Sequence, residues 1–169
     1  MNSAELLGDA YGRIREEVHA VVEGLSPQDL NERLDPGANS IAWLVWHLTR
    51  VQDDHISEAA GREEVWTAQD WHGRFKLPFA SSATGYGQSS KQVGQVRVES
   101  AELLLGYYDA VHEQTMDFIR GLHNTDLDRV VDDSWTPAVT LGVRLVSVIG
   151  DDLQHAGQAA YVRGVLKRR

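Results

Sequence analysis

The residues best suited to chemistry lie near the C-terminal end of the chain, in the segment Asp151-Asp152-Leu153-Gln154-His155. Asp151 and His155 are four residues apart, so on a helix they lie one turn apart on the same face. That spacing allows one helix to give two ligands to one metal ion. Asp152 and His155 are three residues apart and can also converge, so spacing alone leaves both aspartates open as the ligand.

A third ligand is available from His47, which lies on or beside an apolar face that includes Leu44. If this segment is a helix, His47 can point across to Asp151 and His155. Three protein ligands with an open coordination position describe a catalytic type of metal site, not a closed structural one. Asp54, seven residues after His47, lies on nearly the same line of the helix and is a further candidate at this site.

The same pattern has a simpler explanation without a metal ion. A helical Asp–His pair is more often a hydrogen-bonded pair than a metal site, and a buried hydrogen bond between His47 and Asp151 would look identical in the sequence. The other histidines are most simply surface or core residues, although His72 lies in an aromatic-rich loop. In that loop Trp66 and Trp71 are candidate substrate contacts, but such residues more often form a small core under a long loop.

Four segments have the period of an amphipathic helix, and these elements must position the candidate ligands. We expect helices at about residues 3–25, 40–60, 93–122 and 141–166, and no β-strand. The last helix is apolar around most of its circumference, which predicts that its middle, with Asp151 and His155, is buried. The sequence therefore predicts an all-α fold, a four-helix bundle that forms one domain over residues 1–169.

A long loop separates the second predicted helix from the third, from residue 62 to about residue 92. It lacks a helical period and is rich in aromatic residues and glycine. A loop of this length in a compact domain is usually functional or contains short elements of its own. We expect it to cover one end of the bundle.

The composition narrows the choice of partners and of metal ligands. The formal charge of −9 disfavours nucleic acid, because phosphate binding needs a basic face. No stretch is apolar for long enough to span a bilayer and no signal peptide is evident, so we expect a cytoplasmic protein with no membrane partner. The chain contains no cysteine, so histidine and carboxylate side chains would have to hold a metal ion.

The segments around the candidate ligands resemble the DinB-like superfamily, and more narrowly its branch of mycothiol-dependent S-transferases. The resemblance is carried by Asn39 to Leu48, which ends in His-Leu, and by Asp151-x-x-x-His155-Ala156-Gly157-Gln158 followed by Tyr161-Val162-Arg163-Gly164. The similarity in layout covers nearly the whole chain. It implies a four-helix bundle, often a homodimer, that binds a divalent metal ion through three residues.

The usual ligands of the superfamily are one histidine on the second helix and two histidines, four residues apart, on the fourth. Carried over, these positions fall on His47, Asp151 and His155, with aspartate where many relatives have histidine. Carboxylate oxygen is an acceptable ligand for zinc, the expected metal, or for nickel, so the resemblance favours Asp151 over Asp152. Gln158, one turn beyond His155, is expected to orient that histidine.

The resemblance implies a transferase in which a small-molecule thiol, mycothiol or bacillithiol, attacks an electrophilic substrate. A divalent ion with an open position can bind the sulfur and lower its pKa, which gives thiolate at neutral pH. Arg50 or Arg163 would contact the thiol unless they are simply solvated, and the loop around Trp66 and Trp71 would shape the acceptor pocket. Two other functions stay open: a non-catalytic metal-binding stress-response protein, and a metal-dependent hydrolase that activates water.

Overall fold

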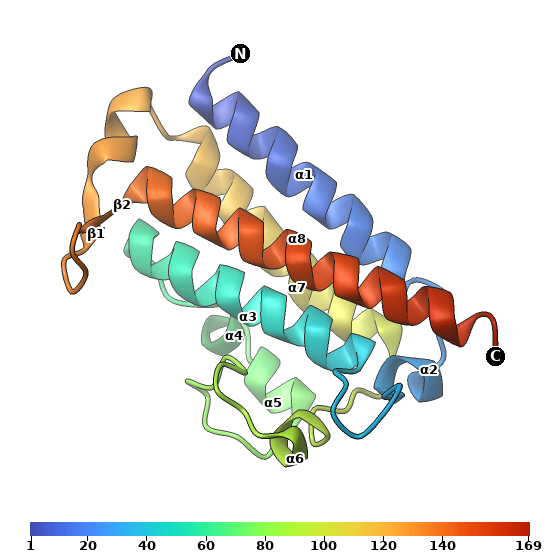
Figure 1. The fold of residues 1–169 in the computed structure, drawn as a ribbon. Coiled ribbons are helices and arrows are strands. Elements are labelled where there is room, and N and C mark those ends of the chain that lie inside the picture. Colours follow the sequence, from blue (N-terminus) through green and yellow to red (C-terminus); the bar gives the residue numbers. More distant parts are fainter.

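Four long helices form the body of the computed structural model, which describes residues 1–169 (Figure 1). They are α1 (Ser3–Val22), α3 (Ile41–Ala60), α7 (Ala101–Arg120) and α8 (Leu141–Leu166). Both α7 and α8 pack against α1 and α3, so the four helices close into a bundle. The prediction of an all-α four-helix bundle is confirmed.

The directions of the helices explain the long connection between α3 and α7. α1 and α8 run one way along the bundle, and α3 and α7 run the other way (Figure 1). Because α3 and α7 are parallel neighbours, the chain between them must return along the whole length of α3, a helix of 20 residues, which is roughly 30 Å. The other two connections, which contain α2 (Pro27–Asn31) and the 3-10 helix η1 (Asn124–Asp128), join helix ends at the same end of the bundle.

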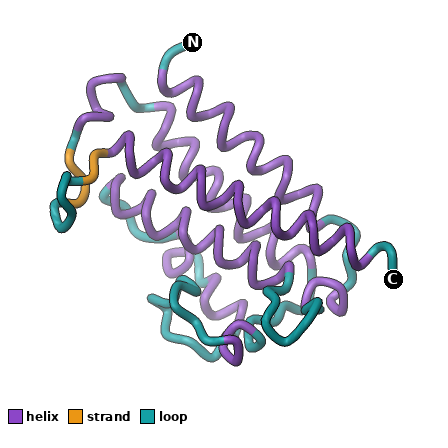
Figure 2. The backbone as a smooth tube through the Cα atoms, in the orientation of Figure 1, coloured by secondary structure: helices purple, strands orange, loops and turns teal.

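We call residues 61–100 the crossover. It contains three short helices, α4 (Val65–Ala68), α5 (Trp71–Phe75) and α6 (Ser90–Val93), joined by irregular chain (Figure 2). Its first two helices pack against α7, and α4 also contacts α3. The crossover therefore lies along the side of the bundle that α3 and α7 form, where the sequence predicted a cover over one end.

Trp66, Trp71 and Phe75 form a small aromatic core beneath the crossover. Their rings lie 5.0, 5.8 and 5.8 Å from the ring of Tyr107 on α7, and all three side chains are buried. Aromatic pairs at such separations add stability beyond the apolar area that they bury. Trp66 and Trp71 thus hold the crossover on the bundle, which is the simpler of the two roles that the sequence allowed.

Polar side chains set the point at which each long helix begins. A side-chain oxygen accepts a hydrogen bond from the first turn of α1, α3, α7 and α8; these N-caps are Asn2, Ser40, Ser100 and Thr140. The third long helix begins at Ala101, so its predicted start near residue 93 is wrong. The chain before it is not helical, and Val96 and Val98 are buried between exposed neighbours, which is the two-residue period of extended chain.

A short antiparallel hairpin precedes α8, although the sequence predicted no strand. β1 (Val130–Asp132) pairs with β2 (Val139–Thr140), with Val130 opposite Thr140 and Asp132 opposite Val139. Strands of three and two residues are too short to show an alternating pattern in the sequence. The loop of the hairpin presents Trp135, whose side chain is 67% exposed.

One continuous apolar core fills the space between the four helices and extends beneath the crossover. α1, α7 and α8 each contribute a stripe of buried side chains to it, as the helical period in the sequence predicted. The prediction that the last helix is buried around most of its circumference is wrong, because Val146, Leu153 and Tyr161 of α8 are exposed. The helix buried on all sides is α3, over residues 41–50, because the crossover covers the side that the other helices leave open. None of the helices combines the length and the apolar character that a bilayer span requires.

A buried guanidinium fastens the crossover to α3. Arg50 is fully buried and donates hydrogen bonds to Glu64 Oε2 at 2.6 Å and to the carbonyl oxygens of Ala83 and Ser81 at 3.1 and 3.5 Å. Its Nη1 also lies 3.6 Å from Asp53 Oδ2. One side chain of α3 thus binds the beginning and the middle of the crossover.

Asp53 completes this network beside Arg50. Its carboxylate accepts hydrogen bonds from the backbone N–H groups of Val65 and Trp66 at 2.9 and 2.8 Å and from the Tyr107 hydroxyl at 2.8 Å. Burial raises the pKa of Asp53, and these hydrogen bonds and the charge of Arg50 oppose that shift. A buried charge with this many partners is tolerated, whereas removal of one partner is costly.

The substitution Arg50→Met tests the network. We expect the free energy of unfolding to fall by about 3 to 5 kcal/mol, because Asp53 would stay buried without its counter-charge. Urea unfolding followed by circular dichroism measures the change. The control is Arg62→Met, which removes an exposed ion pair with Asp117 and should cost at most about 1 kcal/mol. Equal losses in the two variants would contradict the role given to Arg50.

Candidate metal centre

His47, Asp151 and His155 come together where α3 packs against α8. One ligand atom from each residue lies within 4.8 Å of the others. His47 is buried and the other two are half-buried, so the group is reached from one side of the bundle. The structure therefore brings together the three residues that the sequence singled out on two separate helices.

The crossover and α3 hold the imidazole of His47 in one orientation. Its Nδ1 lies 2.6 Å from the carbonyl oxygen of Thr84, which can only accept, so Nδ1 carries the proton and Nε2 keeps its lone pair. The ring of Trp43, one turn earlier on α3, stacks on His47 with 4.5 Å between centroids. The indole N–H of Trp43 donates to Gln88 Oε1 at 2.8 Å, so the crossover restrains this ring as well.

His155 is oriented by its own helix. Its Nδ1 lies 3.0 Å from Gln158 Oε1, one turn further along α8, and its Nε2 lies 3.6 Å from Asp151 Oδ1. The rings of His47 and His155 are 4.8 Å apart and nearly perpendicular. Each histidine thus uses Nδ1 to bind an oxygen atom and leaves Nε2 without a hydrogen bond, an arrangement that metal-binding histidines commonly show.

The charge state and the unpartnered atoms of the group fit a cation. Burial lowers the pKa of His47, with the neighbouring His155 acting in the same direction, so the imidazole is kept in the neutral form that binds metal. Asp151 Oδ2 is buried and has no hydrogen-bond partner. A buried acceptor without a partner is costly, and a bound cation would provide one. Two imidazole nitrogens and a carboxylate oxygen form a donor set that suits zinc or nickel.

The two neighbouring aspartates have different environments. Asp152 is fully buried, neither of its carboxylate oxygens has a hydrogen-bond partner, and its charge would act on Tyr11 and Tyr108 in the core. Burial, together with the charge of Asp151, raises the pKa of Asp152 well above its usual value. Asp152 is absent from the group of converging ligand atoms, so the geometry favours Asp151 as the ligand.

The other polar residues that the sequence singled out lie outside the group. Asp54 is two turns further along α3 than His47, and its carboxylate is 3.6 Å from His55 Nδ1. Arg50 belongs to the buried network described above. Arg163 donates hydrogen bonds of 2.9 Å to two backbone carbonyls at the end of α1. Both arginines therefore bind the protein itself and are not free for a thiol.

Sequence reasoning missed the part that the crossover plays at this site. Gly85 follows Thr84 with a φ of 95°, and a Cβ at this position would lie 2.7 Å from His47 Nδ1. Only glycine lets the backbone adopt this conformation so close to the ring. The sequence offered two signals: the glycines on both sides of Tyr86, and the position of Trp43 one turn before His47.

The fold and the ligand group define a four-helix bundle with a candidate metal centre between its second and fourth long helices. Residues 7–167 match the family model described as Mycothiol-S-transferase, and the chain belongs to this family, within the DinB-like superfamily. Among solved structures, it is similar to the crystal structure of a conserved protein from Enterococcus faecalis, with 28% sequence identity and a TM-score of 0.93 over 100% of this chain and 99% of that chain. No curated protein matches.

The substitution Gly85→Ala tests whether the crossover orients His47. The added Cβ would displace the imidazole, so we expect the affinity for zinc to fall by about tenfold or more. Competition with a chromophoric chelator measures the affinity. Gly87→Ala is the matched control, because Gly87 also has a positive φ of 71° but no heavy atom lies near the position of a Cβ. An equal fall in both variants would show that backbone strain, not contact with His47, is the cause.

The pair Asp151→Asn and Asp152→Asn tests which aspartate is a ligand. In Asp151→Asn we expect a fall of about tenfold or more in zinc affinity, because an amide oxygen carries no charge. In Asp152→Asn the affinity should stay within about twofold of the unsubstituted protein, and the melting temperature should not fall, because no partner of the carboxyl is lost. Zinc affinity that depends on Asp152 and not on Asp151 would overturn the assignment.

Proposed function

We propose that this chain is a metal-dependent S-transferase that joins a small-molecule thiol, mycothiol or bacillithiol, to an electrophilic substrate. The observation that carries the proposal is the convergence of ligand atoms from His47, Asp151 and His155 to within 4.8 Å. Both imidazoles bind oxygen atoms through Nδ1, which leaves Nε2 of each for a cation. Membership of the mycothiol-S-transferase family supports the choice of a thiol as the second component.

These three residues would hold a divalent ion, zinc or else nickel, which supplies a binding position for sulfur and lowers the pKa of the thiol. The carbonyl of Thr84 and the amide oxygen of Gln158 keep both histidines in the tautomer that presents Nε2. Trp43 covers one face of His47 and so restricts the approach of water from that side. The protein thus prepares ligand geometry in advance of binding.

For the reaction itself, the protein has only to position the two substrates and to provide the positive charge of the bound metal ion. The sulfur donates an electron pair to the electrophilic carbon and forms the S–C bond, the leaving group departs with the electrons of its own bond to carbon, and the thiol proton passes to solvent. The chain contains no cysteine, so the sulfur must come from the cosubstrate. Small thiols are kept reduced in the cytosol, which supports a cytoplasmic location for this activity.

The substitution His155→Ala tests the proposal with an electrophile that becomes fluorescent on S-alkylation. We expect the zinc-loaded protein to form the adduct with mycothiol or bacillithiol, and His155→Ala to lower kcat/KM by about 100-fold or more. Gln154→Ala, an exposed position next to His155 on α8, is the control and should keep the rate.

Other outcomes of this assay identify a different function. Loss of the electrophile at the same rate without thiol would indicate hydrolysis and overturn the transferase proposal. No turnover with either thiol, combined with a large fall in melting temperature when zinc is removed, would indicate a metal that only ties the helices together. Circular dichroism of His155→Ala shows whether the variant is folded, so a loss of rate can be assigned to the site.

A further inference from the structure

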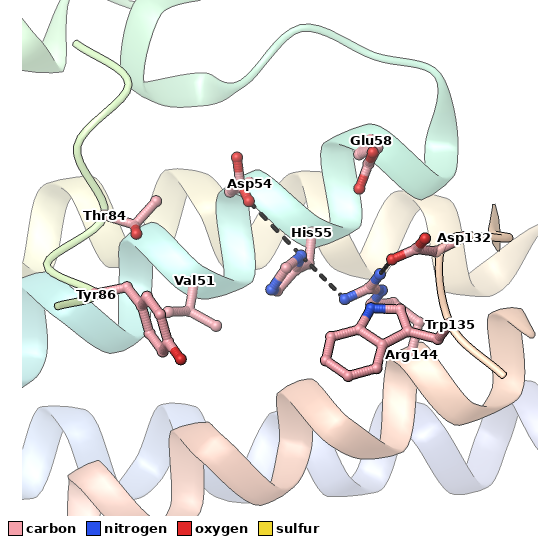
Figure 3. Close-up of a pocket in the computed structure, with 9 residues that line it drawn as sticks. All are labelled: Val51, Asp54, His55, Glu58, Thr84, Tyr86, Asp132, Trp135 and Arg144. Atoms are coloured by element: carbon pink, nitrogen blue, oxygen red, sulfur yellow. Dashed lines mark hydrogen bonds and ion pairs between the residues drawn. The ribbon is translucent and has the colours of Figure 1, made fainter. Parts of the chain in front are cut away.

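A pocket of about 490 Å³ lies between α3, the crossover, α8 and the β1–β2 hairpin (Figure 3). Thr84 connects it to the candidate metal centre, because Thr84 lines the pocket and its carbonyl oxygen accepts the hydrogen bond from His47. Asp54 and Arg144 also line it, and they lie seven residues from His47 and Asp151 respectively. Seven residues are two helical turns, so the pocket reaches roughly 10 Å from the ligand group.

Carboxylates outnumber cations in this pocket. Asp132 Oδ2 forms an ion pair with Arg144 Nη2 at 3.0 Å, and Arg144 Nη1 lies 3.4 Å from His55 Nδ1. The only basic partner of Asp54 is the His55 imidazole at 3.6 Å, and Glu58 has no basic partner. The pocket is therefore negatively charged whether or not His55 is protonated.

Two exposed aromatic side chains stand at opposite ends of the pocket, with His55 between them (Figure 3). Tyr86, on the crossover, is 92% exposed and Trp135, on the hairpin, is 67% exposed. The electron-rich faces of such rings attract organic cations, and the attraction is strongest for tryptophan. Exposed aromatic rings in a pocket where carboxylates outnumber cations are the chemistry that recognises an amine or a quaternary ammonium group.

A second pocket lies on the other side of the ligand group and has fewer carboxylates in its lining. Its volume is about 590 Å³, and its lining includes the apolar side chains of Leu34, Leu44 and Val162, one carboxylate, Asp35, and Gln158, which binds His155. Negative charge raises the pKa of a nearby thiol and so disfavours its thiolate. The second pocket, which has one carboxylate in its lining where the acidic pocket has three, is therefore the better place for the thiol, and the acidic pocket is left for the acceptor.

We propose that the acidic pocket binds a positively charged amine or quaternary ammonium group of the electrophilic substrate, while the reacting carbon lies at the candidate metal centre. This inference rests on the proposed function, since it assigns one of the two substrates of the transfer. The carboxylates of Asp54 and Glu58 supply the negative charge that attracts the cation, and the rings of Tyr86 and Trp135 line the same pocket. The covalent step is unchanged: the S–C bond forms, and the leaving group departs with its electron pair.

A binding experiment tests the pocket without any chemical step. The probes are choline and 3,3-dimethylbutan-1-ol, which have the same shape but differ in charge, and calorimetry of the zinc-loaded protein measures both. We expect choline to bind about tenfold more tightly than the neutral alcohol. The double variant Asp54→Asn with Glu58→Gln should remove the difference, whereas Glu17→Gln, at an exposed position of α1, should keep it.

A turnover experiment tests the same pocket during transfer. The substrates are two haloacetamides with a four-carbon linker, one ending in trimethylammonium and the other in a tert-butyl group. We expect kcat/KM to be about tenfold higher for the cationic substrate, and the preference to fall below about twofold in the double variant and in Trp135→Ala.

The two experiments separate failure of this inference from failure of the proposed function. Transfer to both haloacetamides at equal rates, or equally tight binding of 3,3-dimethylbutan-1-ol and choline, would overturn the cationic assignment and leave the transferase intact. Choline binding that depends on Asp54 and Glu58, without transfer to any electrophile, would keep the cation pocket but refute the transferase and the claim that its occupant is a transfer substrate.

Discussion

The parallel packing of α3 against α7 is the constraint on which the rest of the structure depends. Because the two helices point the same way, the chain must return along the bundle, and its path passes the second turn of α3. The buried guanidinium of Arg50 binds this returning chain at Ala83, one residue before the carbonyl that holds His47. The crossover, which the parallel packing requires, thus also orients the candidate metal ligand His47.

Much of the bundle could be predicted because each long helix shows its buried stripe as a period in the sequence. The candidate ligands could also be named, since a histidine or aspartate in an apolar helix is conspicuous by type alone. The hydrogen bond from His47 to the carbonyl oxygen of Thr84 could not be predicted, because every residue has a carbonyl oxygen and only the folded path decides which one meets His47. The start of α7 was misplaced because Val96 and Val98 extend an apolar pattern through chain that is not helical.

Asp151 and Asp152 are adjacent on α8, yet one is a candidate ligand and the other lies in the core. Adjacent positions differ by about 100° around the helix axis, which is enough to turn one carboxylate toward α3 and the other into the centre of the bundle. Burial raises the pKa of the second well above its usual value, which favours its neutral acid form. Only one of the two carboxylates is therefore among the converging ligand atoms where α3 meets α8, and the spacing of residue types alone could not reveal which.

The ligand group also joins parts of the chain that are far apart in sequence. An ion bound by His47 on α3 and by two residues of α8 would cross-link these two helices. The cross-link would close a ring of chain that contains the crossover, α7 and the hairpin. Closing a long ring restricts the unfolded chain more than the folded one. Metal loading and folding are then thermodynamically linked, so the cellular supply of the metal would set the lifetime of the protein as well as its chemistry.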